Sequence, residues 1–214
     1  MAASQQSVYN KALRFLEERP IASLTEPREP VRLLNIEWTD AVNACLYDGY
    51  WNHAIREVLA TPDSTQTPQF GYLFSYQKPA DWIKTFQIAD NEAFFPLLRR
   101  YSDQNNVWYA EAPQLYIKYV SSDQNFGWNL AYWPPFFTEY VACYLASLLA
   151  PRIKQNSQKV DDIRKELKKC RAMALSKDAM DLPPGRIPPG TWVLSRAPRG
   201  SQYPPGGGWD DGGY

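Results

Sequence analysis

The stretch FFTEYVACYLASLLA, residues 136–150, decides how this chain folds. Apolar side chains fall on nearly every side of the helix that it predicts, so no continuous polar face is left for water. Such a helix is buried on several sides, which places it at the centre of a helical bundle. It is shorter than the roughly 20 apolar residues that span a bilayer, so we expect no membrane partner. Pro134 and Pro135 favour a helix start, and Pro151 predicts a break or a kink.

The sequence N-terminal to this stretch predicts three helical segments. Residues 4–18 carry apolar residues at helical spacing. Residues 27–50 form a second helix with a stripe through Trp38, and Gly49 is its C-terminal signal. A short helix is predicted over residues 52–59.

Residues 157–179 predict the last helix. Ser157 is a capping residue, and Asp161 and Asp162 place negative charge near the positive end of the helix. A narrow apolar stripe is followed round the helix by a charged face, on which Asp161 and Lys165 form an i, i+4 pair. We expect the stripe to pack on the bundle and the charged face to meet water.

Residues 61–133 have a different pattern. A polar loop, TPDSTQT, opens the segment at residues 61–67. Asp103–Asn106 is typical of a hairpin turn between two short strands. We predict a small antiparallel sheet, with strands in residues 82–88, 97–101, 107–110 and 114–120.

These patterns predict an α+β fold in three parts. A helical bundle is formed by the N- and C-terminal helices, residues 1–60 and 134–180. A small antiparallel β-sheet insertion takes residues 61–133. An extended C-terminal arm rich in Pro and Gly takes residues 181–214, because such a composition buries too little surface to offset its own ordering entropy.

Charge and cysteine content narrow the function classes. The chain has 23 basic and 23 acidic residues, so its net charge is zero. Proteins that grip nucleic acid show a basic excess, and we therefore expect DNA to pass near this protein without specific binding. Three widely spaced cysteines and an N-terminus without an apolar signal core indicate a reduced, cytosol-like compartment.

Motifs that carry chemistry are sparse. His53 is the single histidine, and it lies in YWNHAIREV, where a packed or surface side chain is the ordinary interpretation. The sequence shows no tight cluster of metal ligands, no phosphate-binding loop and no Gly-x-Ser-x-Gly elbow. We predict no catalytic residue, no metal and no cofactor, and hence a non-enzymatic protein.

The C-terminal arm carries spaced apolar anchors among its Pro-Pro and Gly runs. Two of them are tryptophans, which are poor choices for a purely solvated tail. Proline restricts the unbound ensemble, so less entropy is lost on docking. The other interpretation is a disordered terminus. The predicted anchors are Ile187, Trp192, Val193, Leu194, Tyr203, Trp209 and Tyr214.

The order of these segments resembles a phage family. Three stretches carry the resemblance: WTDAVNACLYDGYWNHA at 38–54, FGYLFSYQKPADWIKTFQI at 70–88, and FTEYVACYLASLLAPRI at 137–153 followed by a charged helix. In this order they are similar to the head-to-tail adaptor (head-tail connector) proteins related to tail tubular protein A of T7-like phages. The resemblance covers about residues 5–178. Tyr109-Ala110-Glu111 departs from it, because a glycine is expected after the acid.

The resemblance implies a structural protein of the virion, assembled in the host cytoplasm. It implies a homo-oligomeric ring, expected to be dodecameric, between the portal protein and a downstream tail protein (a nozzle or a tail terminator). Double-stranded DNA would pass through its lumen during genome ejection. The helical part and the arm would face the portal, and the sheet would face the tail. The arm could instead clasp a neighbouring subunit.

Packing within the bundle and against ring neighbours is expected of the large apolar side chains of the second and central helices. A second hypothesis is a carbohydrate- or peptide-binding module that uses aromatic residues of the middle sheet or of residues 126–140. A third is a virion-associated hydrolase that depends on His53. The predicted packing residues are Trp38, Trp51, Phe137, Tyr140, Val141, Tyr144 and Leu148.

Overall fold

A computed structural model describes residues 3–68, 71–154 and 156–181. Over these residues the chain contains four α-helices and six strands, and the strands form two antiparallel three-stranded sheets. The predicted α+β class is confirmed.

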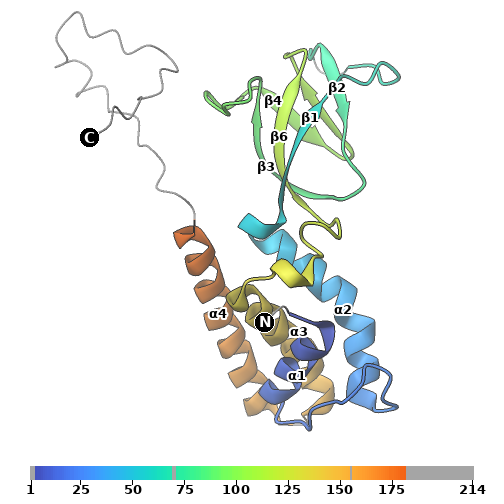
Figure 1. The fold of residues 1–214 in the computed structure, drawn as a ribbon, viewed down its shortest axis with the longest axis vertical. Coiled ribbons are helices and arrows are strands. Elements are labelled where there is room, and N and C mark those ends of the chain that lie inside the picture. Colours follow the sequence, from blue (N-terminus) through green and yellow to red (C-terminus); the bar gives the residue numbers. More distant parts are fainter. Residues whose placement is uncertain (1–2, 69–70, 155, 182–214) are drawn as a thin grey trace, which may run out of the picture. The chain divides into compact units, whose positions relative to one another are not determined.

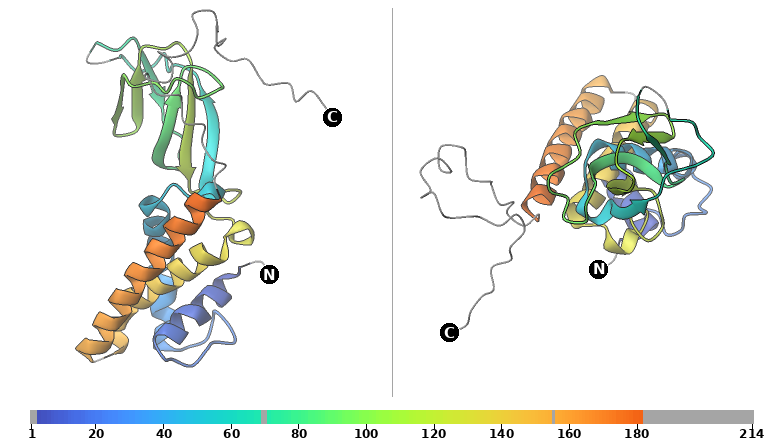
Figure 2. Two further views of the ribbon diagram at one scale, coloured as in Figure 1. Left: turned by 90° about the vertical axis from the view of Figure 1, so that its left-hand side faces the viewer. Right: turned by 90° about the horizontal axis from the view of Figure 1, so that it is seen from above.

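The helices gather round α3, Pro135–Ile153 (Figure 1). α1 (Gln5–Phe15), α2 (Glu29–Asp48) and α4 (Ser157–Met180) each pack against it. α2 and α4 lie on opposite sides of α3 over most of their length (Figures 1 and 2). The nearly all-round burial of α3 follows from its sequence, because an apolar helix needs a neighbour on every apolar side.

The helix ends differ from prediction in two places. α3 continues through Pro151 to Ile153, so the proline falls in the last turn, where its missing N–H removes only a terminal hydrogen bond. Asn156 rather than Ser157 caps α4, and its side-chain oxygen accepts a hydrogen bond of 2.9 Å from the backbone N–H of Gln158. Gly49 follows the last residue of α2, as predicted.

The predicted helix over residues 52–59 is wrong. Asn52–Ala54 form one 3-10 turn, and Ile55–Ala60 form strand β1. A residue far along the sequence stabilises this turn: the backbone N–H of Asn52 donates a hydrogen bond of 3.2 Å to the buried Asp178 carboxylate of α4. The strand then pairs along its whole length with β6, which a helical conformation would not allow.

The remaining strands are β2 (Phe74–Gln77), β3 (Trp82–Ala89), β4 (Tyr101–Gln104), β5 (Val107–Ala110) and β6 (Leu115–Ser121). One sheet has the order β1-β6-β3 and the other β2-β5-β4. A hairpin joins β4 to β5, with Asn105 in the left-handed region at φ 45°. The predicted strand over residues 97–101 is wrong, because the strand is Tyr101–Gln104, and Asp103 and Gln104 pair with β5 instead of forming the turn. Two sheets form where one was predicted, because β6 pairs with β1 and β3 while β5 pairs with β2 and β4.

Two separate apolar cores hold the described residues together. The larger core lies among the four helices and includes Trp38 and Trp51. The smaller core belongs to the strands and is built round Tyr76, Trp108 and Tyr119. Each core buries several large side chains completely, so each part has its own hydrophobic driving force.

Candidate functional site

The predicted arm anchors lie outside the described residues, because the described part of the chain ends at Asp181. They are Ile187, Trp192, Val193, Leu194, Tyr203, Trp209 and Tyr214. Their docking stays a prediction.

The predicted packing residues divide into three groups. Trp38, Trp51, Phe137, Tyr140 and Val141 are buried in the helical core. Tyr144 is half-buried, whereas Leu148 is 40% exposed and does not belong to the core of one chain. Leu148 follows Tyr144 by one helical turn, and this is the side of α3 that α1, α2 and α4 cover least.

His53 is set in an apolar place. Its ring packs on Phe137 with the ring centroids 4.7 Å apart, and both ring nitrogens are buried without a hydrogen-bond partner among the described residues. Burial lowers the pKa of His53 to about 4. An imidazole with this pKa is a poor base near neutral pH, because useful general bases have a pKa close to the working pH.

The three cysteines are buried free thiols. Cys143 of α3 faces Cys170 of α4, with the two sulfur atoms 2.6 Å apart. The hydrogen bond to Cys170, together with burial, raises the pKa of Cys143. Burial also raises the pKa of Cys45. The Cys45 and Cys143 thiols are therefore poor nucleophiles. Among the described residues, no group of three metal-ligating side chains comes together.

Asp81 joins the strands at the start of β3. Its carboxylate accepts a hydrogen bond from the Tyr119 hydroxyl at 3.0 Å and pairs with Arg56 of β1, also at 3.0 Å. The Ser121 hydroxyl of β6 donates to the same oxygen. One carboxylate thus connects all three strands of the first sheet, which makes Asp81 a structural residue.

An aromatic cluster lies where α2 ends against β3. Tyr50 packs on Phe86 with the ring centroids 4.8 Å apart, and the Lys84 ammonium lies 4.1 Å from the centre of the Tyr50 ring. Lys84 also donates to the carbonyl oxygen of Tyr47 at 3.4 Å. Tyr47 and Tyr50 remain exposed. A flat aromatic surface beside a cation is able to stack on a sugar or an aromatic ring.

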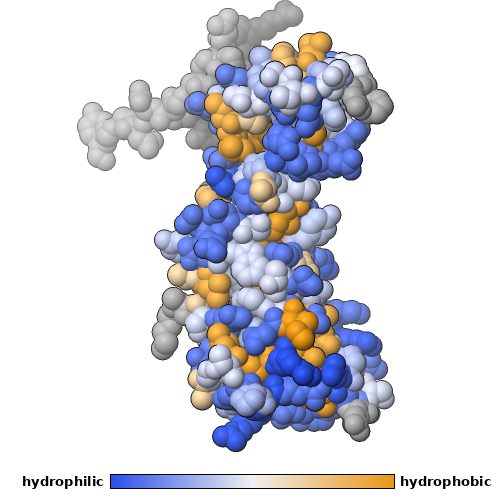
Figure 3. All heavy atoms as spheres, turned by 90° about the vertical axis from the view of Figure 1, so that its right-hand side faces the viewer, coloured by the Kyte–Doolittle hydropathy of each residue, from blue (hydrophilic) through white to orange (hydrophobic). Residues whose placement is uncertain are grey.

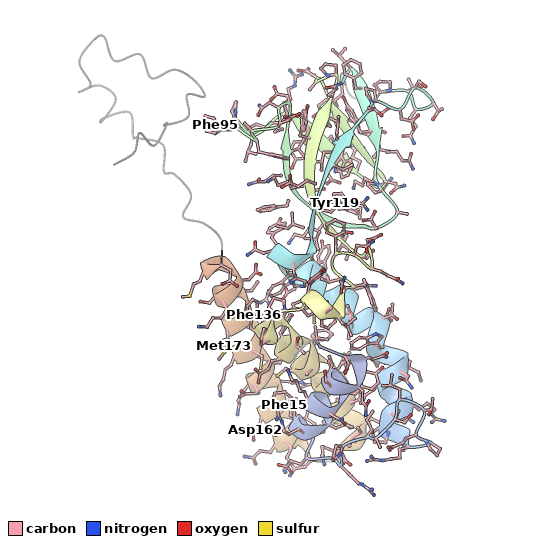
Figure 4. The ribbon with its side chains drawn as sticks, viewed as in Figure 1. Phe15, Phe95, Tyr119, Phe136, Asp162 and Met173 are labelled. Atoms are coloured by element: carbon pink, nitrogen blue, oxygen red, sulfur yellow. The ribbon has the colours of Figure 1, made fainter. Side chains whose placement is uncertain are left out.

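One side of α4 carries two apolar hollows, which together we call the α4 groove. The first, of about 230 Å³, lies between the end of α1 and the start of α4, and Phe15 and Ile163 line it. The second, of about 130 Å³, lies between the start of α3 and the C-terminal half of α4, and Phe136 and Met173 line it. Figure 4 shows Phe15 and then Phe136 at successive levels along α4. Glu166 borders both hollows.

The opposite side of the helices carries an apolar ridge. Ile36 is 64% exposed and Tyr47 is 60% exposed, and both lie on the side of α2 that faces away from α3. Asp40 is exposed between them. We call these three residues the α2 ridge. Figure 3, which is seen from the α2 side, shows hydrophobic residues standing among hydrophilic ones over the helices.

Sequence reasoning missed both surfaces. The helical stripe through Trp38 was found, but Ile36 and Tyr47 form a second stripe of two residues on the far side of the same helix. Their spacing of eleven positions is three helical turns, which is the signal that was available. The α4 groove depends on which helices adjoin α4, and no pattern within α4 indicates that.

Comparison with known proteins adds no family. No family model matches the chain, and no curated protein matches it. In the part of the chain that is described, no helix is long and apolar enough to cross a membrane.

Proposed function

We propose that this chain is a structural adaptor of a phage head-to-tail junction. Copies form a ring, expected to be dodecameric, that joins the portal protein to a downstream tail protein and surrounds the DNA exit channel. The four helices act as a bundle on the portal side, and residues 181–214 act as the docking arm. The ring belongs to the virion and assembles in the host cytoplasm.

The observation that carries the proposal is the division of the chain into two separately cored parts. The helices and the strands are each built round a core, and the two are connected by Val120 of β6, which belongs to the helical core, and by polar contacts such as Lys84 with Tyr47. A protein that must offer different surfaces to two partners needs two such parts. Exposed apolar residues occur on both, with Ile36 on α2 and Phe95, 74% exposed, on the loop between β3 and β4.

The test is assembly with a portal. Purified full-length chain is mixed with portal protein and imaged by negative-stain electron microscopy, and rings seated on the portal are expected. A chain that ends at Asp181 should keep its circular dichroism spectrum and lose portal attachment. Particles completed normally by the shortened chain would contradict the role of the arm.

The aromatic cluster at Tyr47, Tyr50 and Phe86 supports a second candidate, a carbohydrate- or peptide-binding module. Lys84 and Phe86 already pack on the Tyr50 ring, and the exposed parts of Tyr47 and Tyr50 beside them are what a sugar could contact. Binding of the monomeric chain on a glycan array, lost in Tyr50→Ala, would favour this candidate. Rings on the portal without glycan binding would exclude it.

A further inference from the structure

Two thiols from separate helices meet in the helical core. Cys143 of α3 and Cys170 of α4 are both free, and their sulfur atoms lie 2.6 Å apart although the residues are 27 positions apart in the sequence. A disulfide bond joins two sulfur atoms at about 2.05 Å, so a shift of about half an ångström is enough to form one. Cys45, on α2, takes no part in this contact.

The two sulfur atoms differ in their access to small molecules. Cys170 lines the second hollow of the α4 groove, the hollow of about 130 Å³ that Phe136 and Met173 border (Figure 4). Cys143 does not line this hollow and is 2% exposed, against 9% for Cys170. A reagent that enters the hollow therefore reaches Cys170 first and finds Cys143 next to it.

The same contact favours the thiolate of Cys170. The hydrogen bond from Cys143 lowers the pKa of the Cys170 thiol, and its effect exceeds the opposing effects of burial and of the Glu139 and Glu166 carboxylates. The Lys169 ammonium acts in the same direction. Because the thiolate is the nucleophilic form of cysteine, the more accessible sulfur is also the more reactive one.

The hollow selects a small, uncharged oxidant. Its volume of about 130 Å³ holds a molecule the size of hydrogen peroxide, since one water takes up about 30 Å³. Pockets that enclose larger ligands have roughly 300 Å³ or more, so the tripeptide disulfide of glutathione does not fit. Glu139 and Glu166 line the hollow against the single ammonium of Lys169, and this excess of negative charge also disfavours an anionic oxidant.

We propose that Cys170 and Cys143 form a peroxide-reactive dithiol, in which Cys170 is oxidised first and Cys143 closes a disulfide that fastens α4 to α3. The inference goes beyond the adaptor function and does not depend on it. It suits the reduced compartment that the cysteine content indicates, because disulfides in such compartments are usually transient and respond to oxidants.

The chemistry has two steps. The Cys170 thiolate attacks one oxygen of hydrogen peroxide, the O–O bond breaks, and the departing hydroxide takes a proton to become water, which leaves Cys170 as a sulfenic acid. The Cys143 sulfur then attacks the Cys170 sulfur and the S–O bond breaks. The hydroxyl group leaves with the proton of Cys143 as a second water. Two thiols are thereby oxidised to one disulfide while one peroxide is reduced to water.

The expected consequence is a firmer attachment of α4. Of its 24 residues only Val160, Cys170, Ala174 and Asp178 are buried, so much of this helix meets water. A covalent bond near its middle removes the motions in which α4 separates from α3, which hydrogen exchange detects.

Titration of free thiols tests the reaction in the full-length reduced protein. A small excess of hydrogen peroxide should lower the free thiols from the original three to one, and peptide mapping should find residues 143 and 170 cross-linked. Dithiothreitol should restore all three. Met173, which is 58% exposed beside the hollow, reports that peroxide has arrived. Oxidation of Met173 to its sulfoxide with all three thiols still free would overturn the inference.

Alanine variants and dimedone, which traps sulfenic acids, test the order of the two steps. In Cys143→Ala, Cys170 should accumulate as the sulfenic acid and carry the dimedone adduct. In Cys170→Ala, Cys143 should carry none. Cys45→Ala is the matched control and should form the disulfide at the wild-type rate. An adduct on Cys143 rather than on Cys170 would overturn the assignment, and circular dichroism verifies that each variant is folded.

Glutathione disulfide tests the selection by the hollow. The folded protein should keep its three thiols free during the time in which peroxide closes the disulfide, whereas the chain unfolded in urea should take up glutathione. Equal reaction of the folded protein with both oxidants would contradict the selection of peroxide.

Hydrogen exchange tests the fastening of α4. The backbone amides of α4 should exchange about tenfold more slowly, or slower still, in the oxidised protein, and dithiothreitol should reverse the change. Cys143→Ala treated with peroxide should show no such slowing. A cross-linked protein whose α4 amides exchange as before would overturn the fastening.

Discussion

Asp48, the last residue of α2, and Arg171 of α4 form a two-pronged ion pair. Arg171 Nη2 lies 2.7 Å from Asp48 Oδ1, and Arg171 Nε donates to the other carboxylate oxygen. The Tyr140 hydroxyl of α3 donates to that same second oxygen at 2.8 Å. Three helices therefore meet on one carboxylate, and the charge on Asp48 contributes to how they align at this end.

Asp48→Asn should lower the free energy of unfolding at neutral pH by about 1 to 2 kcal/mol, because hydrogen bonds to a charged group are stronger than neutral ones while partial solvation weakens them. Urea denaturation measures the change. Asp161→Asn is the control, since its pair with Arg164 is exposed and joins neighbours on one helix. Equal losses in both variants would contradict a special role for Asp48.

The effect of Asp48 should depend on pH. The hydrogen bond from Arg171 lowers the pKa of Asp48 below its ordinary value of 3.8. A carboxylate with a lowered pKa in the folded state contributes stability that is fully present well above 3.8 and is lost as the pH falls through the folded-state pKa. The difference between wild type and Asp48→Asn should therefore shrink as the pH falls below 3.8 and disappear once the pH is below the folded-state pKa. A constant difference down to acid pH would contradict this account.

His53 should make the protein less stable in mild acid. Burial lowers the pKa of His53 from 6.5 to about 4, so the unfolded chain takes up a proton in this window while the folded chain does not. The contribution is complete above 6.5 and declines by roughly 3 kcal/mol as the pH falls to about 4. His53→Leu should remove this decline and be at least as stable at pH 7, since neither buried nitrogen has a hydrogen-bond partner in the described part of the chain.

Because His53 is the only histidine in the chain, the difference between wild type and His53→Leu isolates its titration. Denaturation series at pH 7, 6, 5 and 4 give this difference. If the free energy of unfolding of the two proteins changed in parallel with pH, the imidazole would be exposed to solvent in the folded state.

Lys78 is a buried cation of the second sheet. Its side chain is 1% exposed, pairs with Asp103, donates to the carbonyl oxygen of Asn105 at 2.8 Å and lies 3.6 Å from the centre of the Trp82 ring. Lys78→Met should cost about 3 kcal/mol, because removal of one partner leaves buried polar groups unpaired. Lys169→Met, at an exposed position, should cost less than about 0.5 kcal/mol.

A double-mutant cycle with Asp103→Asn checks that the loss comes from the pair. The double variant should lose less than the sum of the single variants. Additive losses would assign the stabilisation to the contact of Lys78 with Trp82.

Cys143 and Cys170 should form a disulfide under a mild oxidant such as copper phenanthroline. The two thiols lose two hydrogen atoms to the oxidant as the S–S bond forms, and peptide mapping should find residues 143 and 170 cross-linked. The closed loop should stabilise the protein by roughly 3 kcal/mol. Cys45→Ala should leave the cross-link unchanged. A cross-link that includes Cys45 would contradict the placement of Cys143 of α3 opposite Cys170 of α4.

Local pattern was sufficient for most elements of the fold. The apolar residues 136–150 determine a central helix, because every side of such a helix must leave water. Gly49 marks the end of α2, and Asn105-Asn106 mark the hairpin turn, because turn and cap chemistry acts over a few residues. The strand before the turn was placed too early in the sequence, since β4 includes Asp103 and Gln104.

Residues 52–59 needed information from far along the chain. IREVLA suits a helix or a strand, and its partner β6 lies about 60 residues later, so pairing rather than propensity decides. The burial of Leu148 also depends on residues that are distant in the sequence. Its apolar character was read correctly, but only the placement of the other three helices determines which side of α3 stays open.

The sequence by itself determined the mixed class, the central apolar helix, the neutral charge and the lone histidine, because each follows from composition or from spacing within one element. Only the tertiary structure decided that Asp48 meets Arg171, that His53 has no hydrogen-bond partner among the described residues, and that the α2 ridge and the α4 groove lie on opposite sides of the helices. These relationships join residues of different elements, and their energies depend on distance and burial that no single element contains.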